Sequence, residues 1–292
     1  MKEFKGKVAV ITGASSGLGR ALAGRCAQEG MKVVLADAEQ APLAQAEKDL
    51  RAAGAPVLAV VTDVSNSEDV EALVKKTLDG FGAVHLLCNT AAVHCPKPLA
   101  EATLADWKWV TGVNLYGAIH TLAFFVPVML GQDTECHIVN TASVLGGFHA
   151  LPFDGPYNVS QFGVVTLTET LYLELSQMYP KVKVSLLCPE YANAAILDSE
   201  QHRPAALRND LAEGPAGDAT PHLEEIKSII RAAAQADTAP EQLAAMTFDA
   251  IREERFYIIP HPEAKIIMRD RLDRVNQQRN PENILSMMGI VS

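Results

Sequence analysis

The segment GPYNVSQFG contains a tyrosine whose position suits proton transfer. Tyr157 and Gln161 are four residues apart, so on a helix they share one face. An unperturbed tyrosine has a pKa near ~10, and a lysine within ~4–6 Å would lower it by about 1–3 units. Gln161 carries no charge. The pair therefore predicts either a proton-transfer site with a weakened tyrosine or a fold that has lost its chemistry.

The segment ITGASSGLGR has the glycine spacing of a loop that binds a dinucleotide pyrophosphate. It follows a strand pattern and opens a helical one, which is the context that makes the spacing informative. Gly13 permits a tight turn, Gly17 a close approach of the backbone, and Gly19 the packing of helix on strand. The helix N-terminus offers free N–H groups to phosphate, and Ser15 and Ser16 add hydroxyl groups.

An acidic residue at the end of the next strand pattern predicts which dinucleotide binds. Asp37 lies 18 residues after Gly19. A carboxylate there bonds the ribose hydroxyls of NAD and repels the 2′-phosphate of NADP. No Arg or Lys occupies 36–41 to accept that phosphate. The sequence therefore favours NAD as the cofactor.

Alternating strand and helix patterns must position these residues. Continuous apolar, β-branched runs, typical of strands buried on both faces, cover 7–12, 32–37, 56–63, 84–90, 137–143, 183–189 and 255–260. Apolar residues at helical spacing cover 17–29, 41–53, 67–80, 103–130 and 157–178. The alternation predicts an α/β fold with a doubly wound parallel sheet of about seven strands, of the Rossmann type.

The pattern leaves room for a single domain, expected over 1–262, with 263–292 as a helical extension of it. A polar stretch at about 190–240, rich in Ala, Pro, Gly and charge, interrupts the alternation after the sixth strand. An insertion at the carboxyl edge of a parallel sheet is well placed to cover a substrate. A disordered linker is the other interpretation of this stretch.

Composition excludes several classes of function. The net charge of −10 is spread along the chain without a basic tract, which argues against nucleic acid as a partner. No apolar run reaches the ~18 residues of a membrane span. The start lacks the pattern of a signal peptide, so a cytoplasmic protein is expected. Five cysteines without a CxxC pair predict reduced core residues, and His94 beside Cys95 lacks further ligands at metal-site spacing.

The order and spacing of these motifs resemble the short-chain dehydrogenase/reductase family from Val8 to about Pro262. TGASSGLG (12–19) is similar to the family's cofactor loop, TDVS (62–65) to its adenine-contacting Asp-Val, and CNTAA (88–92) to its NNAG motif. The cofactor site that the resemblance implies consists of Gly13, Ser15, Ser16, Gly17, Leu18, Gly19, Asp37, Asp63, Val64, Asn89, Ala91, Tyr157, Gln161, Pro189 and Ala192.

The resemblance also implies a catalytic set. Asn114 would hold a water of the proton relay, Ser143 would bond the substrate oxygen, and Tyr157 would transfer the proton. Gln161 stands where the family has lysine, and Pro189-Glu190 where it has Pro-Gly. Loss of the lysine charge predicts oxidation slower by roughly ten- to a thousandfold near neutral pH, with recovery as the pH rises.

The resemblance implies hydride transfer between NAD and a secondary alcohol or ketone. Gln161 fits an attenuated enzyme, a deliberate replacement of lysine, or an NAD(H)-binding protein that is catalytically silent and acts through partners. Retention of Asn114, Ser143 and Tyr157 favours an enzyme. A remoter alternative, epoxide or halohydrin chemistry, goes with an arginine at the lysine position and a lost glycine loop, neither of which is found here.

The expected substrate is bulky and hydrophobic, steroid-like or aryl-alkyl, because apolar residues and a long insertion border the site. The predicted substrate contacts are Ser143, Leu145, His149, Phe153, Tyr157, Glu190 and Tyr191, with a structural role as the alternative for His149. Residues 103–130 and 157–178 are apolar on more than one helical face. The surplus apolar surface predicts a homodimer or homotetramer.

Overall fold

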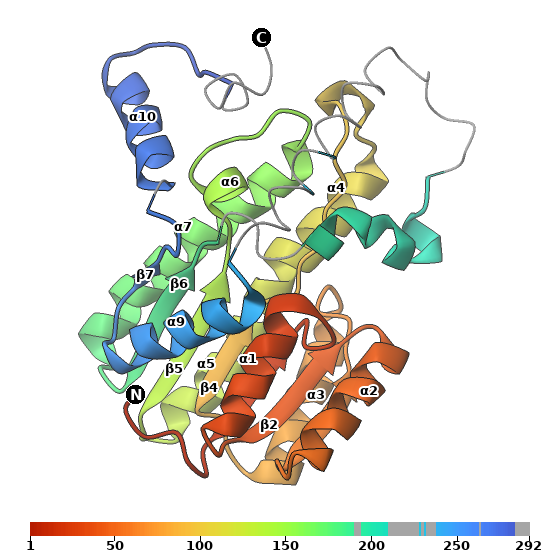
Figure 1. Cartoon of the computed structure of the whole chain (residues 1–292), viewed down its shortest axis with the longest axis vertical. Coiled ribbons are helices and arrows are strands. Elements are labelled where there is room, and N and C mark those ends of the chain that lie inside the picture. Colours follow the sequence, from red (N-terminus) through yellow and green to blue (C-terminus); the bar gives the residue numbers. More distant parts are fainter. Residues whose placement is uncertain (190–193, 210–227, 229–230, 232–237, 263, 284–292) are drawn as a thin grey trace.

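The computed structural model describes residues 1–189, 194–209, 238–262 and 264–283, together with 228 and 231. Strand and helix alternate along the described chain (Figure 1). The strands are β1 (Val8–Thr12), β2 (Lys32–Asp37), β3 (Val57–Val61), β4 (Leu86–Asn89), β5 (Cys136–Thr141), β6 (Val182–Leu187) and β7 (Tyr257–Ile258). The helices are α1 (Gly17–Gln28), α2 (Gln40–Ala52), α3 (Ser67–Phe81), α4 (Leu104–Thr111), α5 (Gly117–Gly131), α6 (Val144–Gly147), α7 (Gly155–Met178), α9 (Pro240–Arg252) and α10 (Ala264–Asn276).

The strands form one parallel sheet in the order β3-β2-β1-β4-β5-β6-β7. The order reverses between β1 and β4, which is where open α/β sheets bind ligands at the carboxyl ends of their strands. This topology confirms the predicted doubly wound sheet of Rossmann type. Strand β7, predicted over 255–260, is limited to two residues that pair with Leu186 and Leu187.

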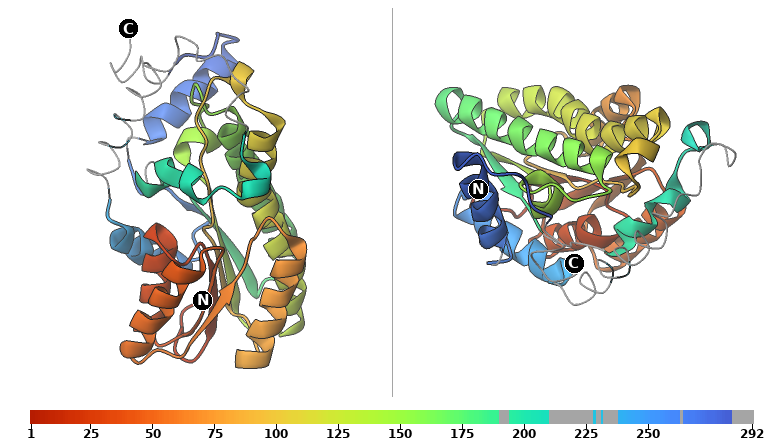
Figure 2. Two further views of the ribbon diagram at one scale, coloured as in Figure 1. Left: turned by 90° about the vertical axis from the view of Figure 1, so that its right-hand side faces the viewer. Right: turned by 90° about the horizontal axis from the view of Figure 1, so that it is seen from above.

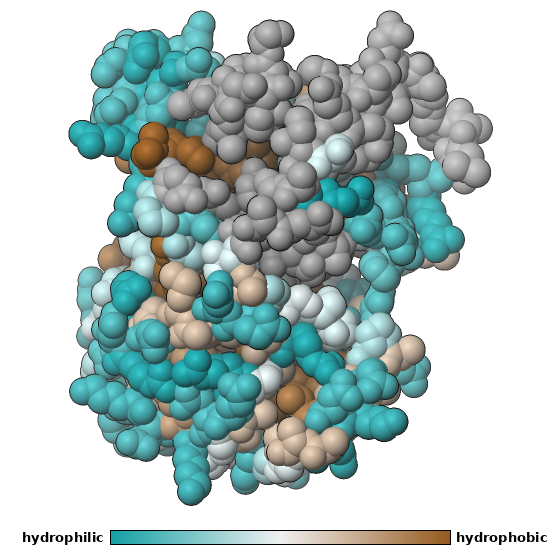
Figure 3. Space-filling model, in the orientation of Figure 1, coloured by the Kyte–Doolittle hydropathy of each residue, from teal (hydrophilic) through white to brown (hydrophobic). Residues whose placement is uncertain are grey.

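Helices cover both faces of the sheet (Figure 2). Successive strand residues point to opposite faces, so Ala9 and Ile11 join a core with α1, α2 and α9, while Val8 and Val10 join another with α3 and α5. Both faces are therefore buried, as the continuous apolar runs predict. Outside this packing, the surface over α1 and α2 is mainly hydrophilic (Figure 3).

Two helical features differ from the prediction. The helix predicted over 103–130 contains a π-helical turn, Gly112–Tyr116, between α4 and α5. Such turns are rare and often mark functional sites. Helix α9 was not predicted; it packs on α1 and buries Leu243, Phe248 and Ile251 completely.

The continuous helical stretch Leu104–Gly131 is long and apolar enough to cross a membrane by length and composition. A core helix satisfies the same criteria, and α5 buries Leu122, Phe125 and Met129 against the sheet core. All five cysteines are buried and unpaired, as predicted.

The described part of the insertion forms two 3-10 helices, η3 (Ala194–His202) and η4 (Ala205–Leu207). They lie above the carboxyl edge of the sheet near α4 (Figure 1). We call residues 194–209 the lid, because several of them line the cavity described next.

Candidate active site

One large cavity of about 860 Å³ lies at the carboxyl ends of the central strands. It extends from the glycine loop after β1 to the lid. The predicted site residues in its wall are Gly13, Ser15, Ser16, Leu18, Gly19, Asp37, Asp63, Val64, Ala91, Ser143, Leu145, Tyr157, Gln161 and Pro189. The fold thus brings together residues from seven segments of the chain.

The glycine loop at one end leaves no space for side chains. Gly13 has a φ of +64°, and a Cβ on it would lie 2.9 Å from the backbone of Ala91. A Cβ on Gly19 would lie 2.1 Å from the carbonyl oxygen of Gly13. Gly17 also has a positive φ, of +47°. The loop therefore keeps its backbone bare at the start of α1, the shape that a pyrophosphate requires.

The carboxylate of Asp37 is fixed at the edge of this loop. Its Oδ2 accepts a hydrogen bond from the backbone N of Ser15 at 3.0 Å, and its Oδ1 accepts one from that of Glu39 at 3.0 Å. Asp63 lies further along the same wall, where its Oδ1 accepts from the backbone N and the hydroxyl of Ser65 at 2.9 and 2.7 Å. Both positions fit the adenosine end of a dinucleotide.

Tyr157 lies at the other end of the cavity, on the first turn of α7. Its ring passes over Gly146, where a Cβ would come within 2.9 Å of it and where φ is +96°. Burial raises the pKa of Tyr157, the hydrogen bond with Ser143 lowers it, and the charge of Asp154 raises it again. The net pKa lies well above the usual value, so the phenol holds its proton at neutral pH.

Gln161 follows one helical turn later and lines the same cavity. Its side chain is 2 % exposed, and its Oε1 has no hydrogen-bond partner among the described residues. A buried, unpartnered acceptor beside the tyrosine fits a donor from a bound molecule, such as a ribose hydroxyl of a nicotinamide cofactor. The bare loop, Asp37 and this amide together fit a dinucleotide.

Asn114 and Asn89 lie behind the cavity wall, on a smaller cavity. Asn114 projects from the π-helical turn, and its Oδ1 accepts from the backbone N of Val93 at 2.8 Å. Its Nδ2 donates to the carbonyl of Val93 at 3.0 Å and to Ser160 Oγ at 3.1 Å. Asn89 donates to Asn140 Oδ1 at 2.8 Å. The Asn114 amide holds the backbone of Val93, and the Asn89 amide holds the side chain of Asn140. The relay water of Asn114 stays a prediction.

Two predicted substrate contacts do not line the described cavity wall, and their contact with substrate stays a prediction. The backbone turns back after Leu145, so that His149 is buried with its Nδ1 3.0 Å from the carbonyl oxygen of Ala150. Phe153 has a positive φ of 65°, and its carbonyl accepts from Lys97 N at 2.7 Å. Leu151 and Asp154 line the cavity instead. The predicted contacts Glu190, Tyr191 and Ala192 lie outside the described residues.

A buried pair of side chains that the sequence analysis did not predict borders Tyr157. His94 Nε2 lies 2.8 Å from Asp154 Oδ1, and the two side chains are 6 % and 3 % exposed. The imidazole meets the Tyr157 ring edge to face, with ring centroids 4.8 Å apart. The sequence does not reveal the pair, because 59 residues lie between His94 and Asp154.

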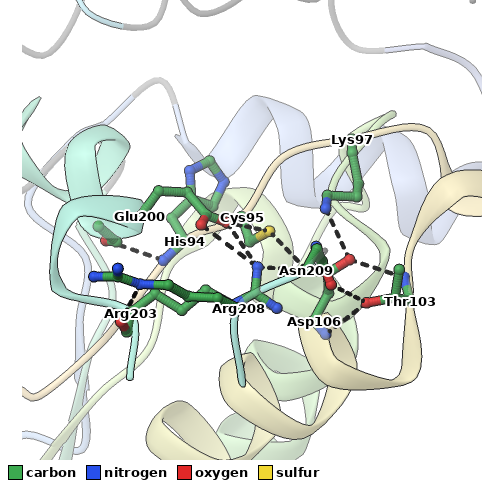
Figure 4. A network of polar contacts seen from close by, with 10 residues as sticks. His94, Cys95, Lys97, Thr103, Asp106, Glu200, Arg203, Arg208 and Asn209 are labelled. Atoms are coloured by element: carbon green, nitrogen blue, oxygen red, sulfur yellow. Dashed lines mark hydrogen bonds and ion pairs between the residues drawn. The ribbon is translucent and has the colours of Figure 1, made fainter. Parts of the chain in front are cut away.

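The lid is anchored to α4 through a buried carboxylate, Asp106 (Figure 4). Arg203, between η3 and η4 of the lid, places its guanidinium 2.6 Å from this carboxylate and 5.0 Å from the ring centroid of Trp109. Lys97 Nζ and Asn209 Nδ2 donate to it at 2.8 and 3.0 Å. Burial alone would raise the pKa of Asp106, but these donors hold it well below its usual range. Arg203 and Asn209 of the lid therefore share one buried anionic partner.

Cys95, Asp106 and Glu200 have ligand atoms within 4.8 Å of one another, a spacing compatible with a metal ion. The carboxylates are already neutralised, because Lys97 and Arg203 pair with Asp106 and Arg203 also contacts Glu200 at 3.1 Å. The arrangement is an ion-pair network, and we assign no metal to it.

The chain belongs to the short-chain dehydrogenase family. Its residues 7–205 match the family model described as short chain dehydrogenase. A "CLA biosynthesis dehydrogenase/reductase" from Lactiplantibacillus plantarum is 30% identical over 283 residues, covering 97% of both chains. A "C alpha-dehydrogenase" from Sphingobium is 32% identical over 268 residues, covering 91% of this chain and 84% of its own length.

A solved structure is closer in sequence. A short-chain dehydrogenase/reductase from Burkholderia phymatum, in complex with NAD, is 45% identical with a TM-score of 0.91. The match covers 97% of this chain and 99% of that one. Family and fold together place the chain among oxidoreductases.

Proposed function

We propose that the chain is an NAD-dependent oxidoreductase that interconverts a bulky hydrophobic secondary alcohol and its ketone. The observation that carries this proposal is the shared cavity. Tyr157, hydrogen-bonded to Ser143, lies at one end, and the glycine loop with Asp37 lies at the other. A proton-transfer group and a dinucleotide site facing one space are what hydride transfer requires.

The charges around the adenosine end support NAD over NADP. Asp37 and Glu39 both line the cavity there, and no Arg or Lys occupies 36–41. A 2′-phosphate would meet two carboxylates and no cation from this turn. The Burkholderia relative, which holds NAD, agrees with this preference.

The bound nicotinamide would give or take the hydride, and the residues of this chain would handle the proton. Ser143 holds the substrate oxygen by its hydroxyl group. In oxidation, Tyr157 must be a phenolate to take the alcohol proton; in reduction, it must be a phenol to give one. Because burial raises the pKa of Tyr157, reduction is favoured near neutrality, and oxidation should rise about tenfold per pH unit below that pKa.

The walls of the cavity between Tyr157 and the lid support a hydrophobic substrate. They are formed by Val93, Trp109, Leu145, Leu151, Ile196 and Leu197. Burial of an apolar substrate against such walls contributes roughly 25 cal/mol per Å² of apolar surface removed from water. An aryl-alkyl or steroid-like alcohol would use this surface, and a small polar alcohol would not.

We also propose that the chain forms a homodimer or homotetramer through the outer faces of α5 and α7. Exposed apolar residues on α7 include Val159, Leu173 and Met178, which are 51 %, 59 % and 62 % exposed. The residue preceding α5, Tyr116, is 53 % exposed as well. Light scattering should give two or four times the mass of one chain, and Leu173→Glu should lower this mass. A monomer in the unaltered chain would contradict the proposal.

The test of the activity is NAD-linked oxidation of a panel of bulky secondary alcohols between about pH 7 and 10, which spans the approach to a tyrosine pKa. We expect turnover that climbs with pH, and faster turnover near neutrality in Gln161→Lys. Absence of turnover in both chains across the panel, with NADH still bound, would contradict the enzyme and indicate a catalytically silent NAD(H)-binding protein.

A further inference from the structure

Asp154 stands at the position that caps helix α7, yet its side chain does not cap the helix. An aspartate directly before a helix ordinarily accepts a hydrogen bond from a backbone N–H of the first turn. The side chain of Asp154 forms no such bond. Its backbone is held independently, because its carbonyl accepts from Asn158 N at 2.8 Å and the residue forms an isolated bridge with Lys97. The carboxyl group therefore does not perform the usual structural task of this position.

The carboxyl group of Asp154 lies instead at the cavity wall. The residue lines the cavity, and its side chain is only 3 % exposed. Its Oδ1 makes no hydrogen bond within the described structure. His94 Nε2 lies 2.8 Å from this oxygen, but the contact does not have the geometry of a hydrogen bond. A buried acceptor without a donor is costly, so this one indicates a donor that arrives with a bound molecule.

A carboxyl group accepts hydrogen bonds in both of its protonation states. When ionised, it offers two acceptor oxygens with about four sites for donors, and when protonated, it keeps part of that capacity. A single contact with an imidazole leaves most of these sites unused. The need for a donor at Asp154 therefore depends neither on its own charge nor on that of His94.

The reacting oxygen of the substrate is not this donor, because Ser143 and Tyr157 are needed for it. Asp154 lies three residues before Tyr157, and the two residues share the cavity wall with the apolar side chains of Leu145 and Leu151. In such a wall, a single polar group fixes the orientation of a hydrophobic ligand. The donor that Asp154 requires therefore belongs to a second polar group of the substrate.

The charge of Asp154 also has a cost for proton transfer. It raises the pKa of Tyr157, which disfavours the phenolate that takes the alcohol proton. A hydroxyl group that donates to the carboxylate would disperse this charge and reduce the cost. Substrate binding at Asp154 and proton transfer at Tyr157 would then support each other.

We propose that Asp154 is a specificity-determining residue that accepts a hydrogen bond from a second hydroxyl group of the substrate, a few bonds from the reacting carbon. The proposal rests on the proposed function, and it narrows the substrate class to hydrophobic hydroxyketones and the corresponding diols. A substrate that lacks this hydroxyl group leaves the buried carboxyl group unpaired beside an apolar surface. Sites of this kind discriminate strongly against the analogue without the donor.

The test compares two pairs of aryl ketones that bind to the complex of the enzyme with NAD⁺, in which the ketone cannot be reduced. The hydroxyketones are phenacyl alcohol and its homologue with one more methylene group. In the partner of each, a methyl group replaces the hydroxyl group. Ligand-observed NMR gives the dissociation constants. The parent should bind at least one hydroxyketone about tenfold more tightly than its partner, as expected for one hydrogen bond to a carboxylate.

Asp154→Leu removes the acceptor and should abolish this preference. Asp154→Ala removes it as well and serves if Asp154→Leu does not fold. Asp154→Asn keeps an acceptor oxygen and should retain part of the preference. His94→Gln is the control, because it removes the imidazole contact and leaves the carboxyl group; it should retain the preference for the hydroxyketone.

The proposal is overturned if the parent distinguishes neither pair by more than about twofold, which is less than a hydrogen bond to a carboxylate contributes. It is also overturned if the variants without the acceptor keep the preference of the parent. Reduction of the same ketones and of the wider panel with NADH, measured in parallel, separates the two claims. A parent that reduces none of them contradicts the proposed function, whereas the ratios of dissociation constants alone decide the role of Asp154.

Discussion

The two ends of the cavity are constructed differently. At the cofactor end, the loop after β1 is shaped by glycines and backbone hydrogen bonds, and the carboxylate of Asp37 is held by backbone N–H groups. At the substrate end, buried side chains from distant segments hold the parts together: His94 contacts Asp154, and Arg203 pairs with Asp106. Backbone geometry fixes one end, and side-chain electrostatics fixes the other.

Because of this difference, the cofactor end and the substrate end of the cavity should tolerate different substitutions. A loop held by backbone atoms is insensitive to pH and to most neighbouring substitutions, but it fails when a side chain is added to its glycines. An end held by buried ion pairs is sensitive to the loss of one charge, because the partner is left buried and unpaired. The following substitutions separate these two kinds of support.

The largest effect is expected from Gly19→Val. Its Cβ would lie 2.1 Å from the carbonyl oxygen of Gly13, so the loop must move, at a cost of about 2–3 kcal/mol in folding free energy. NADH binding, measured by calorimetry, should fall below detection. Gly24→Val on the same helix is the control, because a Cβ there meets nothing within 4 Å. Equal loss of binding in both variants would contradict the assigned role of the loop.

The next effect concerns the lid. Asp106→Asn leaves Arg203 buried beside an uncharged group, which should lower the free energy of unfolding by about 3–5 kcal/mol. Because the pKa of Asp106 is held well below the unfolded value, its stabilisation is present above about pH 4 and is lost as the pH falls through the folded value. The variant should therefore lose less stability on acidification than the parent. Denaturant titrations at several pH values test both statements.

The control for the lid is Asp79→Asn. Asp79 pairs with Lys75 on the surface of α3, with both side chains more than half exposed. Such a pair contributes less than ~1 kcal/mol. If the two substitutions cost the same, the buried pair does not anchor the lid.

A smaller effect is expected from Asp37→Asn, which removes the charge but keeps the shape. NADH should bind roughly tenfold more weakly, since one charged hydrogen-bond acceptor is lost. NADPH binding should improve relative to NADH, because the repulsion of the 2′-phosphate is reduced. Asp49→Asn, on the outer face of α2, is the control. If the ratio of the NADH and NADPH dissociation constants is unchanged, Asp37 does not determine the preference between these cofactors.

The smallest effect is expected where the two ends meet. His202 of the lid contacts the carboxylate of Glu39 beside Asp37, and its side chain is half exposed. Because exposed pairs are weak, His202→Gln should speed NADH release by no more than about fivefold, equivalent to ~1 kcal/mol. Stopped-flow displacement measures this rate. A much larger change would mean that the pair, rather than the buried network, holds the lid.

The sequence was sufficient for the cofactor end and insufficient for the substrate end. The glycine spacing, the continuous strand runs and Asp37 are local patterns, so the sheet, its switch point and the loop followed from them. His94 and Asp154 are not a local pattern, because they meet only through the packing of the loop after β4 on α7. The π-helical turn that carries Asn114 is set by packing too, and the helical spacing of 103–130 contains no signal for it.

The substrate contacts predicted for His149 and Phe153 stay predictions, although neither residue lines the described cavity wall. Their place in the sequence, between Ser143 and Tyr157, suggested that they face the site. The positive φ angles of Gly146 and Phe153 turn the chain so that Leu151 and Asp154 take those places. The sequence does not indicate the positive φ angle of Phe153, because residues other than glycine rarely adopt one.

The most direct measurement is single-turnover formation of NADH in Tyr157→Phe beside Tyr172→Phe, with NAD⁺ and an alcohol that the parent oxidises. Tyr172 lies on the same helix with its side chain facing out, 38 % exposed. We predict that Tyr157→Phe slows hydride transfer by about 10²–10⁴-fold with NADH affinity unchanged, and that Tyr172→Phe does not. Equal rates in the two variants would contradict Tyr157 as the acid and base of this site.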